Sequence, residues 1–158
     1  MIEIKAILHP TDFSQSSNHA LSYAVSFAEQ YGARLYCLHV IEEVTGAMYF
    51  DVLQTPPLVQ LMNEIEQQAR KALEELLPAD VREKLDAECL VRRGAPFLET
   101  IRCAQDLGVD LIVCGTHGRT GLKHALFGSV AEKIVRKAPC PVLSVRHPEH
   151  RFEMPGAS

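Results

Sequence analysis

The sequence lacks several features that would place it in a familiar functional class. It contains no tryptophan, and aromatic residues make up 6% of its 158 residues. No two cysteines have the C-x-x-C spacing, which argues against a zinc ribbon and against a thioredoxin-type redox motif. Lysine and arginine do not cluster and the net charge is −4, so we expect no binding to nucleic acid or to an anionic membrane surface.

Long apolar runs are also missing. The first residues contain no hydrophobic segment typical of a signal peptide, and no apolar stretch is long enough to span a bilayer. The five cysteines are scattered and odd in number, and three of them lie in apolar runs, where cysteine usually acts as a small buried hydrophobe (Cys37, Cys89 and Cys114). These observations favour a cytoplasmic protein with reduced thiols.

Apolar runs and turn-forming residues alternate along the chain, as they do in α/β domains with a parallel sheet. Runs typical of buried strands occupy residues 4–8, 33–40, 87–91, 109–114 and 142–146. Apolar residues at helical spacing predict helices between residue 14 and Gly32, over 58–76, over 97–107 and over 129–137. We expect one domain over residues 1–146.

The segments between these elements contain mixed or polar signals. Residues 41–57 are expected to form a loop, and a short polar link follows Pro78. Residues 147–158 contain two prolines and one glycine and are expected to form a flexible tail.

Residues 111–136 are the most informative stretch. An apolar run over 111–114 is followed by Gly115 and Gly118, and then, after nine further residues, by Gly128 and Ser129 at the start of a helical pattern. Glycine permits a positive φ and a close approach of backbone to a ligand. The first turn of a helix offers unpaired N–H groups and a positive dipole end. The arrangement predicts a phosphate-binding loop.

Two common phosphate motifs do not fit this stretch, and two structural interpretations remain open. The P-loop spacing and the dinucleotide G-x-G-x-x-G spacing are both absent. Ser129 with Glu132 fits a capping box, which needs no ligand. Asp12 could cap the helix that follows it, bind a ligand, or do both.

The spacing G-x2-G-x9-G-S, with GTHGRTGL and APCPVLSVR around it, closely resembles the ATP-binding branch of the universal stress protein family. The resemblance extends from Ile4 to Arg146. It implies an open, Rossmann-like five-stranded parallel sheet with strand order 3-2-1-4-5 and helices on both faces. It also implies a ligand crevice where the strand order reverses, between the first and fourth strands.

The resemblance assigns residues to that crevice. It places adenosine contacts on Pro10, Thr11, Asp12 and Val40. It places the phosphate side on Cys114, Gly115, Thr116, Gly118, Gly128, Ser129 and Val130, and we expect His117 and Arg119 to approach a phosphate as well. The ligand would be ATP, ADP or AMP, with Mg²⁺ on the phosphates because this segment has no carboxylates to hold a metal alone.

The histidines outside this loop suggest no metal site. His9 and His39 end neighbouring predicted strands, but no third ligand has a recognisable spacing. We expect both to be packed strand-end residues.

These observations favour an ATP-binding regulatory module of a stress response, acting on a protein partner that the sequence does not identify. The family resemblance implies a homodimer formed by antiparallel pairing of the edge strand from Val142 to Arg146, which is apolar up to its last residue. No general base can be identified, so we expect at most slow ATP hydrolysis or autophosphorylation. The alternatives are a nucleotide-free dimeric scaffold and a slow ATPase.

Overall fold

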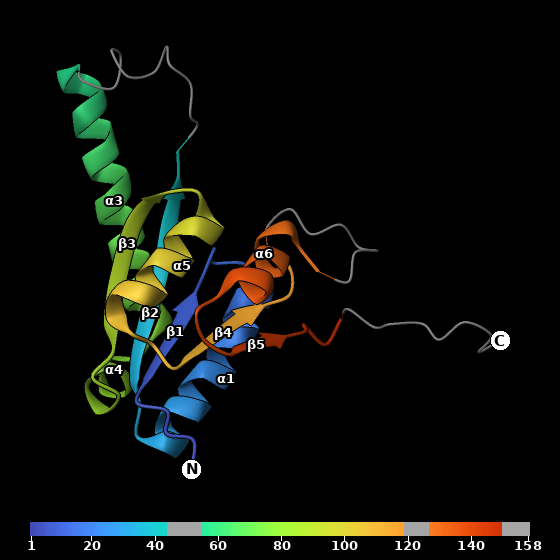
Figure 1. The fold of residues 1–158 in the computed structure, drawn as a ribbon. Coiled ribbons are helices and arrows are strands. Elements are labelled where there is room, and N and C mark those ends of the chain that lie inside the picture. Colours follow the sequence, from blue (N-terminus) through green and yellow to red (C-terminus); the bar gives the residue numbers. More distant parts are fainter. Residues whose placement is uncertain (44–54, 119–126, 150–158) are drawn as a thin grey trace.

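The computed structural model describes residues 1–43, 55–118 and 127–149. Its strands are β1 (Ala6–Pro10), β2 (Arg34–Glu42), β3 (Glu88–Gly94), β4 (Leu111–Gly115) and β5 (Val142–Val145). They form one parallel sheet in the order β3-β2-β1-β4-β5 (Figure 1). The expected fold class and strand order are confirmed.

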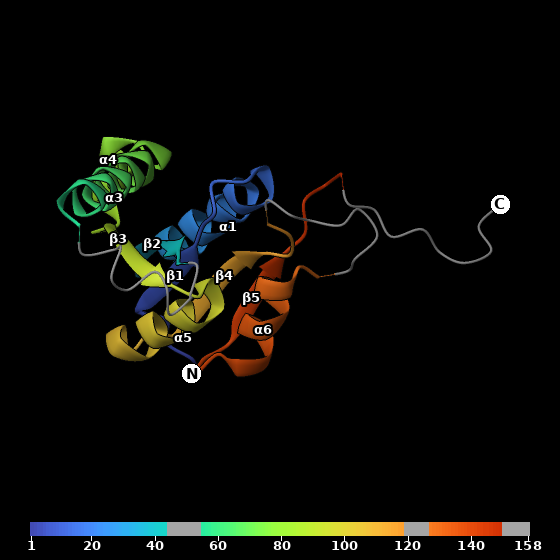
Figure 2. The same ribbon diagram turned by 90° about the horizontal axis from the view of Figure 1, so that it is seen from above.

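Helices cover both faces of this sheet, as Figure 2 shows. They are α1 (Gln15–Tyr31), α3 (Pro56–Leu76), α4 (Ala79–Lys84), α5 (Pro96–Leu107) and α6 (Ser129–Lys137). The first three of these lie on one face, and α5 and α6 lie on the other. No helix in the described ranges is long and apolar enough to cross a membrane.

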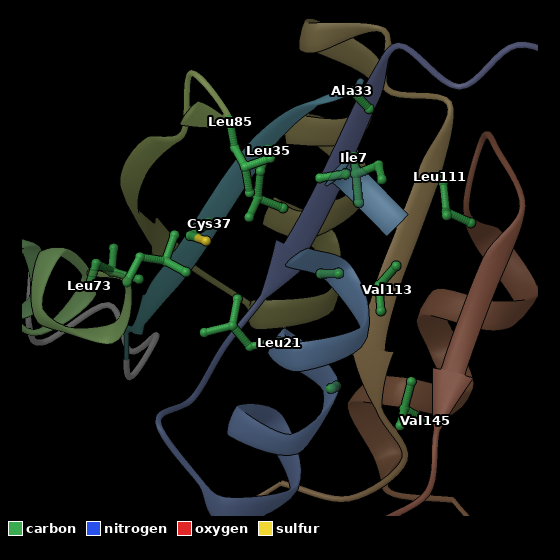
Figure 3. Close-up of a cluster of buried hydrophobic side chains, with 14 residues drawn as sticks. Ile7, Leu21, Ala33, Leu35, Cys37, Leu73, Leu85, Leu111, Val113 and Val145 are labelled. Atoms are coloured by element: carbon green, nitrogen blue, oxygen red, sulfur yellow. The ribbon is translucent and has the colours of Figure 1, made fainter. Parts of the chain in front are cut away.

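Successive residues of the central strands face opposite helical layers, because side chains alternate along a strand. On β1, Ile7 packs into the layer under α1 and α3, together with Leu21 and Leu73 (Figure 3). The next residue, Leu8, packs into the other layer with Ile112 and with residues of α5 and α6. The sheet is therefore buried on both faces.

Several boundaries differ from the sequence-based predictions; β1, for example, is Ala6–Pro10 where residues 4–8 were expected. β2 continues to Glu42 and β3 to Gly94, because the two strands pair with each other in register as far as these residues. α3 begins at Pro56, inside the expected loop. The expected polar link after Pro78 contains the short helix α4, whose first turn holds an acidic residue and whose last turn holds two basic ones, in accord with the helix dipole.

Candidate functional site

The predicted crevice corresponds to the carboxyl ends of β1 and β4, where the strand order reverses. The chain leaves β1 at Pro10, and the Thr11 N–H then donates to the Leu38 carbonyl of β2 at 2.8 Å. Asp12 Oδ1 accepts a hydrogen bond from the Ser14 N–H at 3.0 Å. These bonds hold the loop after β1 at the edge of the crevice.

Asp12 is not the cap of α1. The N-cap is Ser14, whose hydroxyl oxygen accepts from the Ser17 N–H at 3.2 Å. The helix-cap interpretation of Asp12 is therefore wrong, because the Asp12 carboxylate accepts from the N–H of the N-cap residue Ser14, outside the helix, and makes an Asx turn.

Thr11 is buried, and its hydroxyl oxygen is used inside this turn. It accepts from the Phe13 N–H at 3.0 Å and from the Ser17 hydroxyl at 2.8 Å. The Thr11 carbonyl accepts from His39 Nδ1 at 2.9 Å, and the His39 ring lies 4.5 Å from the Phe13 ring. The Thr11 side chain therefore shapes the loop.

Gly118 lies against the loop after β1. A Cβ on Gly118 would lie only 2.5 Å from Asp12 Oδ2, so no other residue fits here without moving the carboxylate. Gly118 itself is exposed. This contact places the predicted adenosine and phosphate sides of the crevice next to each other.

Gly128 ties the start of α6 to the end of β4. Its N–H donates to the Thr116 carbonyl at 2.7 Å, and a Cβ on Gly128 would lie 3.3 Å from that carbonyl oxygen. Gly128 is also the N-cap of α6, and no side chain of the described residues makes a capping hydrogen bond to this helix. The capping-box interpretation of Ser129 is therefore wrong, because Ser129 is the first residue of the helix.

Gly115 has a packing role in the same region. A Cβ at this position would lie 2.8 Å from Ser16 Oγ and 3.1 Å from the Ser16 backbone, so the missing side chain lets α1 approach β4. None of Gly115, Gly118 and Gly128 has a positive φ. Of the two properties of glycine considered above, these positions use close approach and not a left-handed backbone.

The other predicted residues are buried to different degrees. Cys114 is buried in the layer under α5 and α6, and desolvation raises the pKa of its thiol to about 11. His117 is also buried, with Nδ1 2.9 Å from Thr116 Oγ1. Val40 is half-buried on the α5 side of the sheet, whereas Ser129 and Val130 are exposed in the first turn of α6.

His9 is packed near the end of β1, as expected, whereas His39 lies within β2, three residues before its end at Glu42. His9 has no exposed surface, and its Nδ1 lies 2.8 Å from the Val113 carbonyl, to which it donates. Arg119 lies outside the described residues. Sequence reasoning missed Ser17 and Phe13 as organisers of the loop; the only signal for Ser17 was its place three residues after a serine cap.

The model of the universal stress protein family matches residues 3–146. The chain belongs to the universal stress protein family. Universal stress protein MJ0577 of Methanocaldococcus jannaschii is 31% identical, over 90% of this chain and 94% of its own. Universal stress protein YxiE of Bacillus subtilis is 34% identical, over 85% and 94% of the two chains.

Solved structures of universal stress proteins share the fold. The structure of MJ0577 superposes with a TM-score of 0.75 at 30% identity, covering 97% of this chain and all of that one. A universal stress protein solved in complex with cAMP has a TM-score of 0.60 at 21% identity, covering 91% and 98%. Nucleotide binding therefore occurs among proteins of this fold.

In this universal stress protein the crevice combines a carboxylate, apolar strand ends and a helix N-terminus. The described residues contain no group of three or more His, Cys, Asp or Glu that could hold a metal ion. The arrangement is suited to binding a phosphorylated ligand through backbone N–H groups.

Proposed function

We propose that this universal stress protein binds an adenine nucleotide, ATP with Mg²⁺ or its products ADP and AMP, between β1 and β4. The observation that carries the proposal is the contact between Asp12 and Gly118 beside a helix N-terminus that no side chain caps. A carboxylate accepts hydrogen bonds from hydroxyl and amino groups, and backbone N–H groups donate to phosphate oxygens.

The phosphate side is formed by the first turn of α6. The N–H groups of Ser129, Val130 and Ala131 have no acceptor within the helix, and the helix dipole favours an anion at this end. The Gly128 N–H is already bonded to Thr116, so Gly128 contributes by its missing side chain.

The adenosine side is formed by the ends of β1 and β2. Asp12 would accept from ribose hydroxyls or from the adenine amino group. Pro10 and Val40 are half-buried and offer apolar surface to a purine. Thr11 supports this side indirectly, because its hydroxyl holds the loop that carries Asp12.

Mg²⁺ would be held by the phosphate oxygens, because the described residues provide no cluster of metal ligands. When bound, it would neutralise part of the triphosphate charge. We propose a regulatory role, in which nucleotide occupancy changes the affinity for a protein partner. Hydrolysis, where it occurs, would be slow.

Isothermal titration calorimetry of the purified protein with ATP and Mg²⁺ tests the proposal. We expect Asp12→Asn to weaken ATP binding at least about tenfold, because the substitution removes a charge-assisted hydrogen bond to the ligand. Gly118→Ala should do the same by displacing the Asp12 carboxylate. The matched control is Asp110→Asn. The Asp110 carboxylate accepts hydrogen bonds from the N–H groups of Lys5 and Ala6, and Asp110 directly precedes β4 at the opposite end of the sheet.

Two results would overturn the proposal. The first is an absence of measurable heat with ATP, ADP and AMP, which would favour a nucleotide-free scaffold. The second is an equal loss of affinity in Asp12→Asn and Asp110→Asn, which would show that the crevice is not where the nucleotide binds.

A further inference from the structure

Two free cysteines lie side by side on neighbouring strands, away from the crevice residues. Cys37 of β2 and Cys89 of β3 are register partners in the parallel pairing of these strands. Both side chains face the layer under α3, where Cys37 is fully buried and Cys89 is half-buried; Figure 3 shows Cys37 in this layer.

The spacing of the pair suits a bridging metal better than a disulfide. Neighbouring strands lie about 4.8 Å apart, and register partners project in the same direction. A disulfide requires its Cβ atoms to approach to about 3.8 Å, which would draw the two strands together. Two metal–thiolate bonds of about 2.3 Å in a line span roughly 4.6 Å, which matches the strand spacing.

The surroundings of the pair restrict which metal it can hold. Zinc in structural sites takes four ligands, whereas the described residues contain no group of three or more His, Cys, Asp or Glu with suitable geometry. Soft thiolate ligands select Cu(I), which is satisfied by two sulfurs in a line. We propose that Cys37 and Cys89 form a two-coordinate site for a soft monovalent cation, Cu(I).

Positively charged side chains lie near the pair on the α3 and α4 side. Binding releases the two thiol protons to solvent, leaves copper as Cu(I), and gives a bis-thiolate complex with one negative charge. Arg70 of α3 and Arg82 of α4 lie near Cys89, as do Glu74 and Glu88. Arg82 Nε is buried and has no hydrogen-bond partner among the described residues, so its N–H is a candidate donor to a metal-bound sulfur.

Competition with the chromophoric chelator bicinchoninate, under anaerobic conditions with the reduced full chain, tests this inference. We expect one Cu(I) per chain and an X-ray absorption spectrum with two sulfur neighbours. Cys89→Ser should weaken Cu(I) binding at least about a hundredfold. Loss of a group that only supports a metal ligand costs up to about a hundredfold, and Cys89 would be a ligand itself. The matched control is Cys140→Ser, because Cys140 is also free and half-buried but packs on the other face of the sheet.

Cys89→Ser binding within threefold of the unaltered chain, or an equal loss in Cys140→Ser, would overturn the site, as would nitrogen ligands in the spectrum. Cys37→Ala is a second variant, and its loss of Cu(I) binding would support a site formed by both cysteines. Far-UV circular dichroism of each variant checks the fold, and should Cys37→Ala fail to fold, the half-buried Cys89→Ser decides the result.

Discussion

His9 sits at the carboxyl end of β1 with no exposed surface. Burial disfavours the imidazolium and lowers the pKa of His9 to about 4, while the Val113 carbonyl and the charge of Asp12 raise it by less. The ring is therefore neutral at physiological pH, with the proton on Nδ1 and a lone pair on Nε2. That Nε2 atom and Ser16 Oγ are both buried without a partner among the described residues.

We expect the free energy of unfolding to fall as the pH is lowered from 6.5 to about 4, because only the unfolded chain protonates His9 in this window. Above 6.5 the ring is neutral in both states and contributes no pH dependence. The full loss is about 3 kcal/mol, at about 1.4 kcal/mol for each tenfold difference in proton affinity. Urea unfolding at several pH values measures it.

His9→Gln should remove this part of the pH dependence. The control is His19→Gln, because His19 is a half-buried residue of α1 whose ring packs against Tyr23 and His147 and not at the end of β1. Identical pH profiles for His9→Gln and the unaltered chain would contradict the assignment.

At the scale of elements, α3 divides into two halves with different roles. Its buried residues, Ala69 and Leu73, both lie in the C-terminal half. Figure 1 shows the N-terminal half projecting beyond the sheet, and there Val59 and Leu61 are exposed. The fully buried apolar contacts of the helix therefore come from one half, whereas Arg93 of β3 contacts the other half through the Met62 carbonyl and the Glu66 carboxylate.

This division predicts that a leucine-to-alanine substitution lowers the free energy of unfolding by different amounts in the two halves of α3. Leu73→Ala should lower the free energy of unfolding by about 2–5 kcal/mol, because Leu73 is fully buried and its truncation leaves a cavity. Leu61→Ala, at a site that is 48% exposed, should change it by less than about 0.5 kcal/mol. Chemical denaturation measures both, and similar values for the two variants would contradict the division.

Elements whose residues carry their own periodicity could be predicted from the sequence, and elements that depend on a partner could not. The apolar run before Gly115 indicated β4, and the glycine spacing indicated where α6 begins. The extension of β2 to Glu42 depends on pairing with β3, which has no signal within either strand. The same holds for the site, since the contact of Asp12 with Gly118 exists only once β1 and β4 are neighbours.

At the scale of the whole molecule, β5 is an open edge of the sheet. The Pro141 and Val145 carbonyls accept hydrogen bonds from β4, through the N–H groups of Ile112 and Thr116. Because backbone groups alternate in direction along a strand, Val142 and Ser144 direct theirs outward. An apolar strand with outward groups of this kind favours pairing with a second copy.

We expect a homodimer formed through β5, which light scattering at micromolar concentration measures. Ser144→Pro should give monomers, because proline removes the outward N–H without removing a bond to β4. Ser144→Ala keeps that N–H and should remain dimeric. A monomeric unaltered chain, or a dimer that survives Ser144→Pro, would contradict this interface.

The sheet also separates two interiors that share no side chain, one under α1 and α3 and the other under α5 and α6. A change of volume in one layer reaches the other only through hydrogen-bonded strands, which deform little. Energetic effects from the two layers should therefore sum independently. The consequence is modularity. The cysteine pair proposed to bind copper lies in one layer and Val40, proposed to contact a purine, lies in the other, so either site can be altered without changing the affinity of the other.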